Sequence, residues 1–188
     1  MRRLLVGVVA ASLMLVGIAG PATARPGNAG PPTIASVATQ TDDLSLLVTA
    51  LDCADLVGAV ASPRDNLTVF APTNEAFLDL LGFDSVEDLV AAVNAGFNGD
   101  ACAAVATILG GGDEEAGAAA LTKVLLYHVV PGRYVEQRVV RTDSLPTLNG
   151  EPIVVAETFG GDDAVGLVAT NIQTSNGVVH VIDEVLLP

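Results

Sequence analysis

Two histidines are the side chains of this sequence best suited to proton transfer or metal binding. His128 follows Tyr127 within an apolar segment, and His180 lies in a short run whose two strand faces would both be largely apolar. A zinc site shared by these two would need carboxylates from elsewhere, because the chain has no third histidine. We therefore predict no metal and no cofactor. We expect both imidazoles to be packed and hydrogen-bonded to backbone or to a neighbouring polar group.

Two cysteines, Cys53 and Cys102, are the other residues with distinctive chemistry. They are not arranged as C-x-x-C and no histidine lies close to either in the sequence, which disfavours a redox or metal role. Because residues 1–24 have the composition of an export signal, the even cysteine count favours one disulfide over two free buried thiols. A bridge that closes a loop of about 50 residues would stabilise the fold by ~4 kcal/mol on the loop-entropy estimate.

The 22 acidic residues supply many carboxylate pairs, so an exported carboxylate-dependent hydrolase is one alternative function. The sequence contains no G-x-S-x-G nucleophile turn, no H-E-x-x-H helix and no Walker loop. Sites that bind sugars usually stack them on aromatic faces, whereas this chain has no Trp and only two tyrosines, Tyr127 and Tyr134. We predict that the protein is not an enzyme, with small-molecule or glycan binding as a second alternative.

Residues 1–24 have the composition of a cleavable export signal. Two arginines precede an uncharged apolar run, and small residues occupy the positions before the expected cleavage site. The run is at the short end for spanning a bilayer, and small residues and Pro follow it rather than a basic stop, so cleavage is favoured over a retained anchor. We predict a secreted protein without a membrane span after cleavage, with a linker over residues 25–32 and one domain over residues 33–188.

The net charge limits the classes of partner. Removal of the signal would leave six of the eight basic residues against 22 acidic ones, a formal charge of −16. Proteins bind phosphate backbones through clustered Lys and Arg, whereas this sequence has a single lysine, Lys123, and dispersed arginines. We therefore expect no nucleic-acid partner. The acidity indicates a well-solvated exterior, with a salty habitat or a cationic partner as alternatives.

The elements that must position these residues begin with helices. Apolar residues recur at helical spacing over residues 41–60. Ser85 is followed three residues later by Asp88, which is the pattern of a capping box at a helix start. Residues 101–109 and 118–127 also predict helices, and the charged, glycine-rich segment between them predicts an exposed loop.

A strand-to-helix junction is predicted between these helices. Thr68 to Ala71 is a short β run, Pro72 ends it, and Thr73 or Asn74 can then accept hydrogen bonds from the first free amides of a helix. A structural role of this junction is favoured over a contact with a partner.

The pattern changes after Pro131 to short β-rich runs separated by turn residues such as Asn149-Gly150 and Asn176-Gly177. Residues 178–182 are apolar on both faces, which is typical of a central core strand. Helices thus come first and strands later. This segregation predicts an α+β domain built on an antiparallel sheet or sandwich rather than a parallel sheet with crossover helices.

Three segments carry more specific information than composition. They are Thr68-Val-Phe-Ala-Pro-Thr-Asn-Glu-Ala-Phe77, Leu121-Thr-Lys-Val-Leu-Leu-Tyr-His-Val-Val-Pro-Gly132 and Asn176-Gly-Val-Val-His-Val-Ile-Asp-Glu-Val-Leu-Leu-Pro188. In order and separation they resemble the N-terminal box, the Tyr-His segment and the C-terminal box of the fasciclin domain. The resemblance covers about residues 33–188.

This resemblance implies a fold and a class of function. The implied fold is a seven-stranded β-sandwich or wedge with several α-helices packed around it, mainly from the N-terminal half. The implied function is that of a secreted, non-enzymatic adhesion or extracellular binding module. Such a module acts through contacts with an extracellular protein, with matrix or with a cell-surface component, or through self-association.

The resemblance also names candidate partner-binding residues. In animal members similar to this chain, the segment that corresponds to Tyr127 and His128 has been implicated in binding integrins. A second integrin-associated pair, Asp-Ile in those members, corresponds here to Asn171 and Ile172, so the carboxylate able to complete an integrin's metal site is missing. We therefore take these four residues as candidates without naming an integrin as the partner. A buried, hydrogen-bonded pair is the alternative role of Tyr127 and His128.

Overall fold

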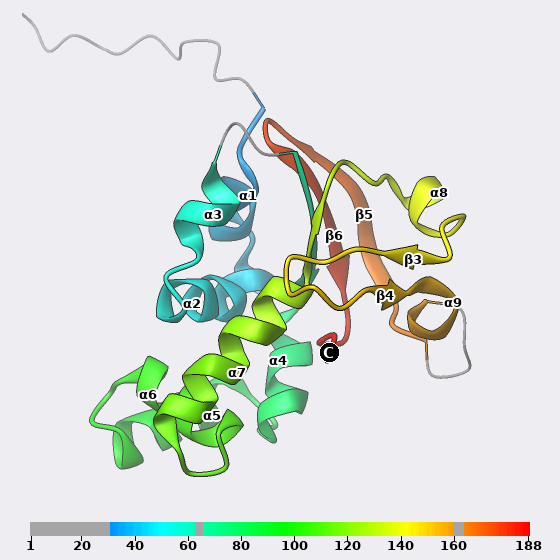
Figure 1. Cartoon of the computed structure of the whole chain (residues 1–188). Helices are drawn as coiled ribbons and strands as arrows, with labels where there is room; N and C mark the ends of the chain where they lie inside the picture. Colours follow the sequence, from blue (N-terminus) through cyan, green and yellow to red (C-terminus); the bar gives the residue numbers. More distant parts are fainter. Residues whose placement is uncertain (1–30, 63–65, 160–163) are drawn as a thin grey trace, which may run out of the picture.

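The structure of the protein is a computed structural model that describes residues 31–62, 66–159 and 164–188 (Figure 1). The expected signal at residues 1–24, and the expected linker 25–32 except for its last two residues, lie outside the described residues. Helices gather on one side of a four-stranded sheet, and a two-stranded sheet with two short helices packs on the other side.

The helical layer comes from the first two thirds of the described chain. Its elements are α1 (Ile34–Gln40), the 3-10 turn η1 (Asp42–Leu44), α2 (Ser45–Cys53), α3 (Val57–Ala61), α4 (Asn74–Leu81), α5 (Val86–Gly96), α6 (Ala101–Leu109) and α7 (Glu114–Tyr127). Within the described ranges, no single helix is long and apolar enough to cross a membrane, although α5 and α6 reach that length and composition together as a pair bent by 98°.

Helix starts in this layer follow the local sequence. The Ser85 cap predicted before α5 is confirmed, because its hydroxyl accepts the Asp88 N–H at 3.1 Å; the Asp88 carboxylate bonds back to this hydroxyl, at 2.7 Å, rather than to the Ser85 N–H of a full capping box. Helix α6 covers the predicted residues 101–109. Helix α4 starts at the predicted junction, with the Thr73 hydroxyl accepting the Ala76 N–H at 3.3 Å.

Helix α7 begins earlier than the sequence pattern indicates. The loop expected over residues 110–115 ends at Asp113, whose carboxylate accepts the Ala116 N–H at 3.0 Å. Glu114 and Glu115 therefore lie in the first turn of α7, where the positive end of the helix dipole favours carboxylates. The prediction of a loop was wrong there because acidic runs are typical both of exposed loops and of helix N-termini.

The main sheet has the strand order β2-β1-β6-β5. Its strands are β1 (Leu67–Pro72), β2 (Val129–Pro131), β5 (Leu167–Thr174) and β6 (Gly177–Ile182). Strand β1 is antiparallel to β2, and β5 is antiparallel to β6, but the central pair of β1 and β6 is parallel. The prediction of an antiparallel sheet is therefore wrong at its centre. Turn residues report only on neighbouring strands, whereas β1 joins β6 across most of the domain.

The second sheet and two short helices come from the chain between β2 and β5. They are α8 (Glu136–Val139), β3 (Ser144–Leu145), β4 (Ile153–Val154) and α9 (Val155–Thr158), with β3 and β4 antiparallel. The α+β class is confirmed. The described residues contain six strands rather than the seven implied by the resemblance, and this part of the chain contains helical turns as well as the expected strands.

The two central strands separate two hydrophobic cores. Both β1 and β6 are buried along their whole length, as predicted for residues 178–182. Val69 and Val179 belong to the core shared with the helices, while Phe70 and Ile182 belong to the core shared with the second sheet. Successive side chains point to opposite faces of a strand, so each central strand contributes to both cores.

Covalent and polar contacts join distant parts of the chain. Cys53 and Cys102, the pair that the sequence favours for a disulfide, are bonded to each other and connect α2 with α6. Asn176, in the turn before β6, is only 1% exposed. Its side-chain oxygen accepts the Ile34 N–H at 2.9 Å and its amide nitrogen donates to the Val60 carbonyl at 2.8 Å. This one side chain therefore ties α1 and α3 to the sheet.

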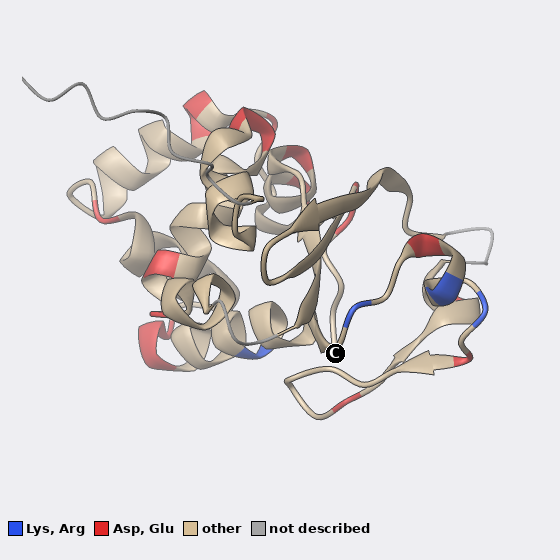
Figure 2. Cartoon of the chain, turned by 90° about the horizontal axis from the view of Figure 1, so that it is seen from above, with Lys and Arg blue, Asp and Glu red and all other residues tan. Residues whose placement is uncertain are grey.

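Charge is distributed unevenly over the molecule (Figure 2). The basic residues of the described chain all lie in or after α7 and are Lys123, Arg133, Arg138 and Arg141. Two of the arginines are engaged: the Arg138 guanidinium stacks 4.5 Å from the centre of the Tyr134 ring, and Arg133 donates to the Gln173 side chain at 2.8 Å. The described residues before α7 carry acidic side chains and no Lys or Arg.

Candidate binding surface around Tyr127

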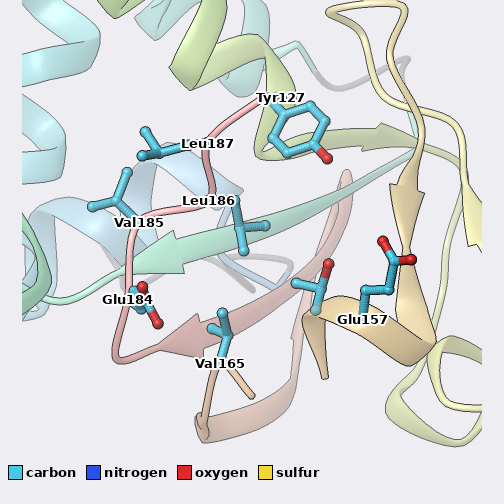
Figure 3. Close-up of a pocket in the computed structure, with 8 residues that line it drawn as sticks. Tyr127, Glu157, Val165, Glu184, Val185, Leu186 and Leu187 are labelled. Atoms are coloured by element: carbon cyan, nitrogen blue, oxygen red, sulfur yellow. The ribbon is translucent and has the colours of Figure 1, made fainter. Parts of the chain in front are cut away.

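Tyr127 lies at the end of α7 and lines an open cleft of about 210 Å³ (Figure 3). The other walls come from α9, from Val165 and from the segment that follows β6. The lining residues are Tyr127, Glu157, Thr158, Val165, Glu184, Val185, Leu186 and Leu187. Tyr127 is half-buried and packs against the core of the second sheet, so this candidate residue has one side available to solvent.

His128, the next residue, is buried and holds the wall of this cleft in place. Its Nδ1 lies 2.7 Å from the Val124 carbonyl oxygen, and its Nε2 accepts the Leu186 N–H at 2.9 Å. The N–H donor from Leu186 requires an unprotonated Nε2, so the proton is on Nδ1 and is donated to Val124. The ring thus bonds helix α7 to the segment after β6.

Burial lowers the pKa of His128 from its ordinary 6.5 to about 4, against a smaller opposing effect of the hydrogen bond to Val124. The cause is desolvation, because a buried imidazolium loses its hydration. Protonation would also replace the acceptor at Nε2 by a second N–H facing Leu186. The neutral ring is therefore the form that holds the segment after β6.

The segment held by His128 has two buried side chains, Val185 and Leu186, between exposed ones. Leu186 is 4% exposed and belongs to the core of the second sheet, whereas Leu187 is 59% exposed. Glu184 is exposed as well. Fixing the Leu186 backbone therefore helps to place Leu187 and Glu184 in the wall of the cleft that Tyr127 also lines (Figure 3).

The Tyr127 hydroxyl is a protonated donor in acidic surroundings. It donates a long hydrogen bond, 3.4 Å, to the Pro152 carbonyl. Burial raises the pKa of Tyr127 above its ordinary 10.0, and the charge of Glu151 raises it further. Glu157 and Glu184 line the same cleft. The surface consequently offers an aromatic face and carboxylate acceptors, beside a hydroxyl whose proton is donated to Pro152.

His180 lies on a different part of the sheet and has the opposite tautomer. Its Nε2–H donates to the Tyr134 carbonyl at 2.8 Å, and its Nδ1 accepts the Asn171 N–H at 3.5 Å. The ring is fully buried and stacks on Phe70, with 5.6 Å between the ring centres. Burial lowers the pKa of His180, while the bond to Tyr134 and the charge of Glu136 oppose this. The prediction of a packed histidine bonded to backbone is confirmed.

Asn171 shapes an irregularity in β5 and holds α8. Its backbone adopts a left-handed conformation, with φ of 59°, where the register between β5 and β6 shifts. The side-chain oxygen accepts the Glu136 N–H at 2.9 Å, and the amide nitrogen donates to the Glu136 carboxylate at 3.3 Å. Asparagine tolerates this backbone conformation better than most residues. The side chain thus satisfies an amide at the start of α8, which has no other side-chain cap.

The four candidate partner-binding residues do not form one site. Tyr127 packs against the core of the second sheet, whereas Ile172 packs against the core of the helical layer. Asn171 bonds to α8, and His128 is buried with both ring nitrogens occupied by backbone groups. Of the four, Tyr127 alone lines the cleft.

A shared metal site is not assembled from the histidines. Each ring already uses both nitrogens in contacts with backbone. Across the part of the chain that the structure describes, no group of three or more His, Cys, Asp or Glu side chains is arranged to hold a metal ion.

Sequence reasoning missed residues that organise the fold around these sites. The Asn74 side chain accepts the Leu46 N–H at 2.9 Å and donates to the Asp42 carbonyl at 3.0 Å, which caps α2 from the start of α4. Glu136 connects Thr170 and Asn171 to α8. No local pattern reveals these contacts, because the partners are far apart in the sequence.

Together, the fold and the cleft define a small α+β domain in which helices cover one face of a mixed sheet and a tyrosine lies beside the chain that leaves its central strand. The fasciclin domain family matches residues 42–97 and 102–188. The chain belongs to this family.

Three proteins and structures illustrate the relationship. Protein sll1483 of Synechocystis sp. is 34% identical over 158 residues, covering 83% of this chain and 73% of that protein. Periostin of Homo sapiens is 28% identical over 148 residues, which are 77% of this chain but 14% of periostin. The solved FAS1 domain pair of the insect cell adhesion molecule fasciclin I has a similar fold, with a TM-score of 0.57 and 13% identity over 84% of this chain and 51% of that one.

Proposed function

We propose that this chain is exported and acts outside the cell as a non-enzymatic adhesion or binding module whose contact surface is centred on Tyr127. The partner would be an extracellular protein, a matrix component or a cell-surface component. The family relationship supports the class, since fasciclin I is a cell adhesion molecule.

The choice of surface rests on one observation. The ring nitrogens of His128, next to Tyr127, are hydrogen-bonded within the protein, whereas Tyr127 and Leu187 keep surface that a partner could contact. His128 is occupied by Val124 and Leu186. Tyr127 itself is half-buried, and Leu187 is 59% exposed. Interface residues that contribute most to binding energy are often aromatic and sit beside other apolar groups.

The negative charge of this surface indicates which partners would bind it. Glu151 and Glu157 are exposed beside Tyr127, and Glu184 is exposed on the facing segment. Complementary charges guide association and disfavour like-charged partners. The proposed partner therefore presents an apolar or planar group flanked by Lys or Arg side chains.

The test presents the purified domain, residues 25–188, to arrays of matrix proteins, glycans and cell surfaces. We expect saturable binding to a basic protein or matrix component. Tyr127→Ala is expected to weaken it by about tenfold or more, while Tyr127→Phe, which keeps the ring, retains most of it. Val168→Ala is the matched control, since Val168 is 61% exposed but lies on β5.

The outcomes separate the parts of this proposal. A folded Tyr127→Ala protein that binds like wild type would show that the contact surface lies elsewhere. Saturable binding to glycans alone would favour the glycan-binding alternative, and absence of binding on every array would contradict an adhesion role. Turnover of an arrayed glycan would establish the hydrolase alternative.

Export has its own test. Expression of the full chain with its first 24 residues should place the protein in the medium or outside the inner membrane, with Arg25 as the new N-terminus on N-terminal sequencing. Retention of Met1 in a membrane fraction would contradict the proposed cleavage.

A further inference from the structure

A second cavity, separate from the cleft at Tyr127, lies inside the helical layer among α2, α4, α5 and α6. Its volume is about 240 Å³. It is lined mainly by apolar side chains, among them Phe77, Leu89, Val90 and Ala101, with Thr49 and Asn94 as polar members of the wall. We call this cavity the helical pocket.

The helical pocket has an apolar floor and a partly polar mouth. Phe77 and Leu89 are each 4% exposed, whereas Val90 is 50% exposed and Asn94 is also exposed. Apolar walls without atoms opposite them lose dispersion contacts, which an apolar ligand restores. An apolar cavity of ~150 Å³ suffices for benzene, so the helical pocket suits a somewhat larger ligand.

The disulfide holds two walls of the helical pocket together. Cys53 lies at the end of α2, one helical turn after Thr49, and Cys102 directly follows Ala101 in α6. Both Thr49 and Ala101 line the pocket. Because the bond fixes α2 to α6, the walls are in place before a ligand arrives, and less ordering entropy is lost on binding.

The surroundings of the mouth are acidic. Glu87 lies one turn before Val90 on α5, and Asp52 lies three residues after Thr49 on α2. Asp100 directly precedes Ala101, and its carboxylate accepts the Cys102 and Ala103 N–H groups at the start of α6. No Lys or Arg is present in residues 31–62 and 66–109. A ligand with a carboxylate would face these charges without a cation from these two ranges to pair with, whereas an ammonium group would be attracted.

We propose that the helical pocket binds a small apolar molecule of about ten carbon atoms whose polar end is neutral or positively charged. The apolar part lies against Phe77 and Leu89, and the polar end lies at the mouth near Val90 and Asn94. Carboxylates of the same length, such as medium-chain fatty acids, bind more weakly because of their charge.

The test measures displacement of a neutral fluorescent probe, N-phenyl-1-naphthylamine, from the oxidised domain. Three ligands of equal length are compared below their aggregation limits: decylammonium, decan-1-ol and decanoate. Methylammonium is included because it carries the charge without the chain. We expect saturable binding with a Kd of about 10–100 µM for the first two. Decanoate is expected to bind about tenfold or more weakly than decylammonium, and methylammonium is expected to displace no probe.

Two kinds of variant locate the binding. Ala101→Phe fills the helical pocket and is expected to abolish probe binding, whereas the control Ala119→Phe adds the same side chain at an exposed position of α7. Val90→Lys places a cation at the mouth on an exposed helical position, which does not depend on repacking. It is expected to weaken decylammonium and strengthen decanoate by about threefold each, and Val90→Glu is expected to do the reverse.

Each result bears on the proposal. It is overturned if the folded wild-type domain shows no saturable probe binding, or if a folded Ala101→Phe domain binds like wild type. It is also overturned if decanoate competes as well as decylammonium. Should Ala101→Phe fail to fold, the opposite shifts expected from Val90→Lys and Val90→Glu decide, and equal affinities in both variants would reject the site.

Discussion

His128 and His180 are both buried with both ring nitrogens bonded, but the two rings hold different parts of the domain. His128 donates from Nδ1 and accepts at Nε2, and it joins α7 to the segment after β6. His180 donates from Nε2 and accepts at Nδ1, and it joins β6 to the Tyr134 carbonyl and to the irregular part of β5. The charge of Glu136 raises the pKa of His180, whereas it is not among the causes of the pKa shift of His128.

The difference shows how one residue type serves two structural purposes. Around His128 the ring hydrogen-bonds a helix to the irregular segment after β6, and that segment forms part of the cleft at Tyr127. Around His180 the strand pairing already fixes β6, and hydrogen bonds between Asn171 and Glu136 add to the polar contacts there. We therefore expect changes at His128 to have larger and more local effects on the cleft than changes at the Asn171 network.

The largest effect is expected from His128→Ala. Removal of the ring leaves a cavity and deprives the Leu186 N–H of its acceptor, so the free energy of unfolding should fall by about 3–4 kcal/mol. Urea unfolding measures this loss. Hydrogen exchange should show the Leu186 amide losing more protection than amides of β6. A loss below about 1 kcal/mol, or equal changes in both segments, would contradict the role assigned to His128.

The next effect concerns pH. His128 has a folded pKa of about 4 against an ordinary value of 6.5, so the unfolded chain binds an extra proton between these values. Its contribution to stability is fully present above pH 6.5 and is lost as pH falls toward 4, by ~3 kcal/mol at 1.36 kcal/mol per unit. Urea unfolding from pH 7 to 4 should show a steeper decline for wild type than for His128→Gln. Parallel curves would show that His128 is not the group responsible.

A smaller effect is expected from Asn171→Asp, which replaces the side-chain amide by a carboxylate. The new carboxylate would lie beside that of Glu136, and the hydrogen bond from the Asn171 amide to Glu136 would be lost. Together these changes should destabilise the domain by about 1 kcal/mol at pH 7. Asn98→Asp is the control, because Asn98 has a similar left-handed backbone with φ of 51° but is exposed. Equal losses of unfolding free energy in the two variants would show that the neighbouring Glu136 carboxylate is not the cause.

The smallest effect is a change in the pKa of His180 without a change in the pKa of His128. Glu136→Gln removes a charge that raises the pKa of His180, so this pKa should fall further. The pKa of His128 should stay at about 4. Proton NMR of the two imidazole rings during titration measures both. A shift at His128 of the same size as that at His180 would mean that the two environments are coupled.

The burial of His180 and several helix caps could be predicted from the sequence, but the long-range contacts of the two histidines could not. Apolar neighbours on both strand faces are sufficient to predict that His180 is buried in a central strand, and the Ser85 and Thr73 caps follow from local patterns. The parallel pairing of β1 with β6 and the bonds of His128 to Leu186 depend on long-range contacts. Periodicity and turn residues describe near neighbours along the chain, so they carry no information on such contacts.

The candidate site was predicted in part for the same reason. The resemblance singled out Tyr127, and the structure places it in a cleft. It could not show that Ile172 faces the other core or that Asn171 is engaged by α8. The helical pocket has no sequence signature, since its lining residues have the helical spacing of ordinary core positions.

The hydrogen bonds of the Asn176 and His128 side chains also bear on how the domain would carry mechanical load. Asn176 fastens the incoming chain at Ile34 to the beginning of β6, and His128 fastens the outgoing chain at Leu186 beyond its end. A pulling force applied through these two points would run lengthwise along β6. It would load the hydrogen bonds to β1 and β5 together in shear rather than opening them one after another.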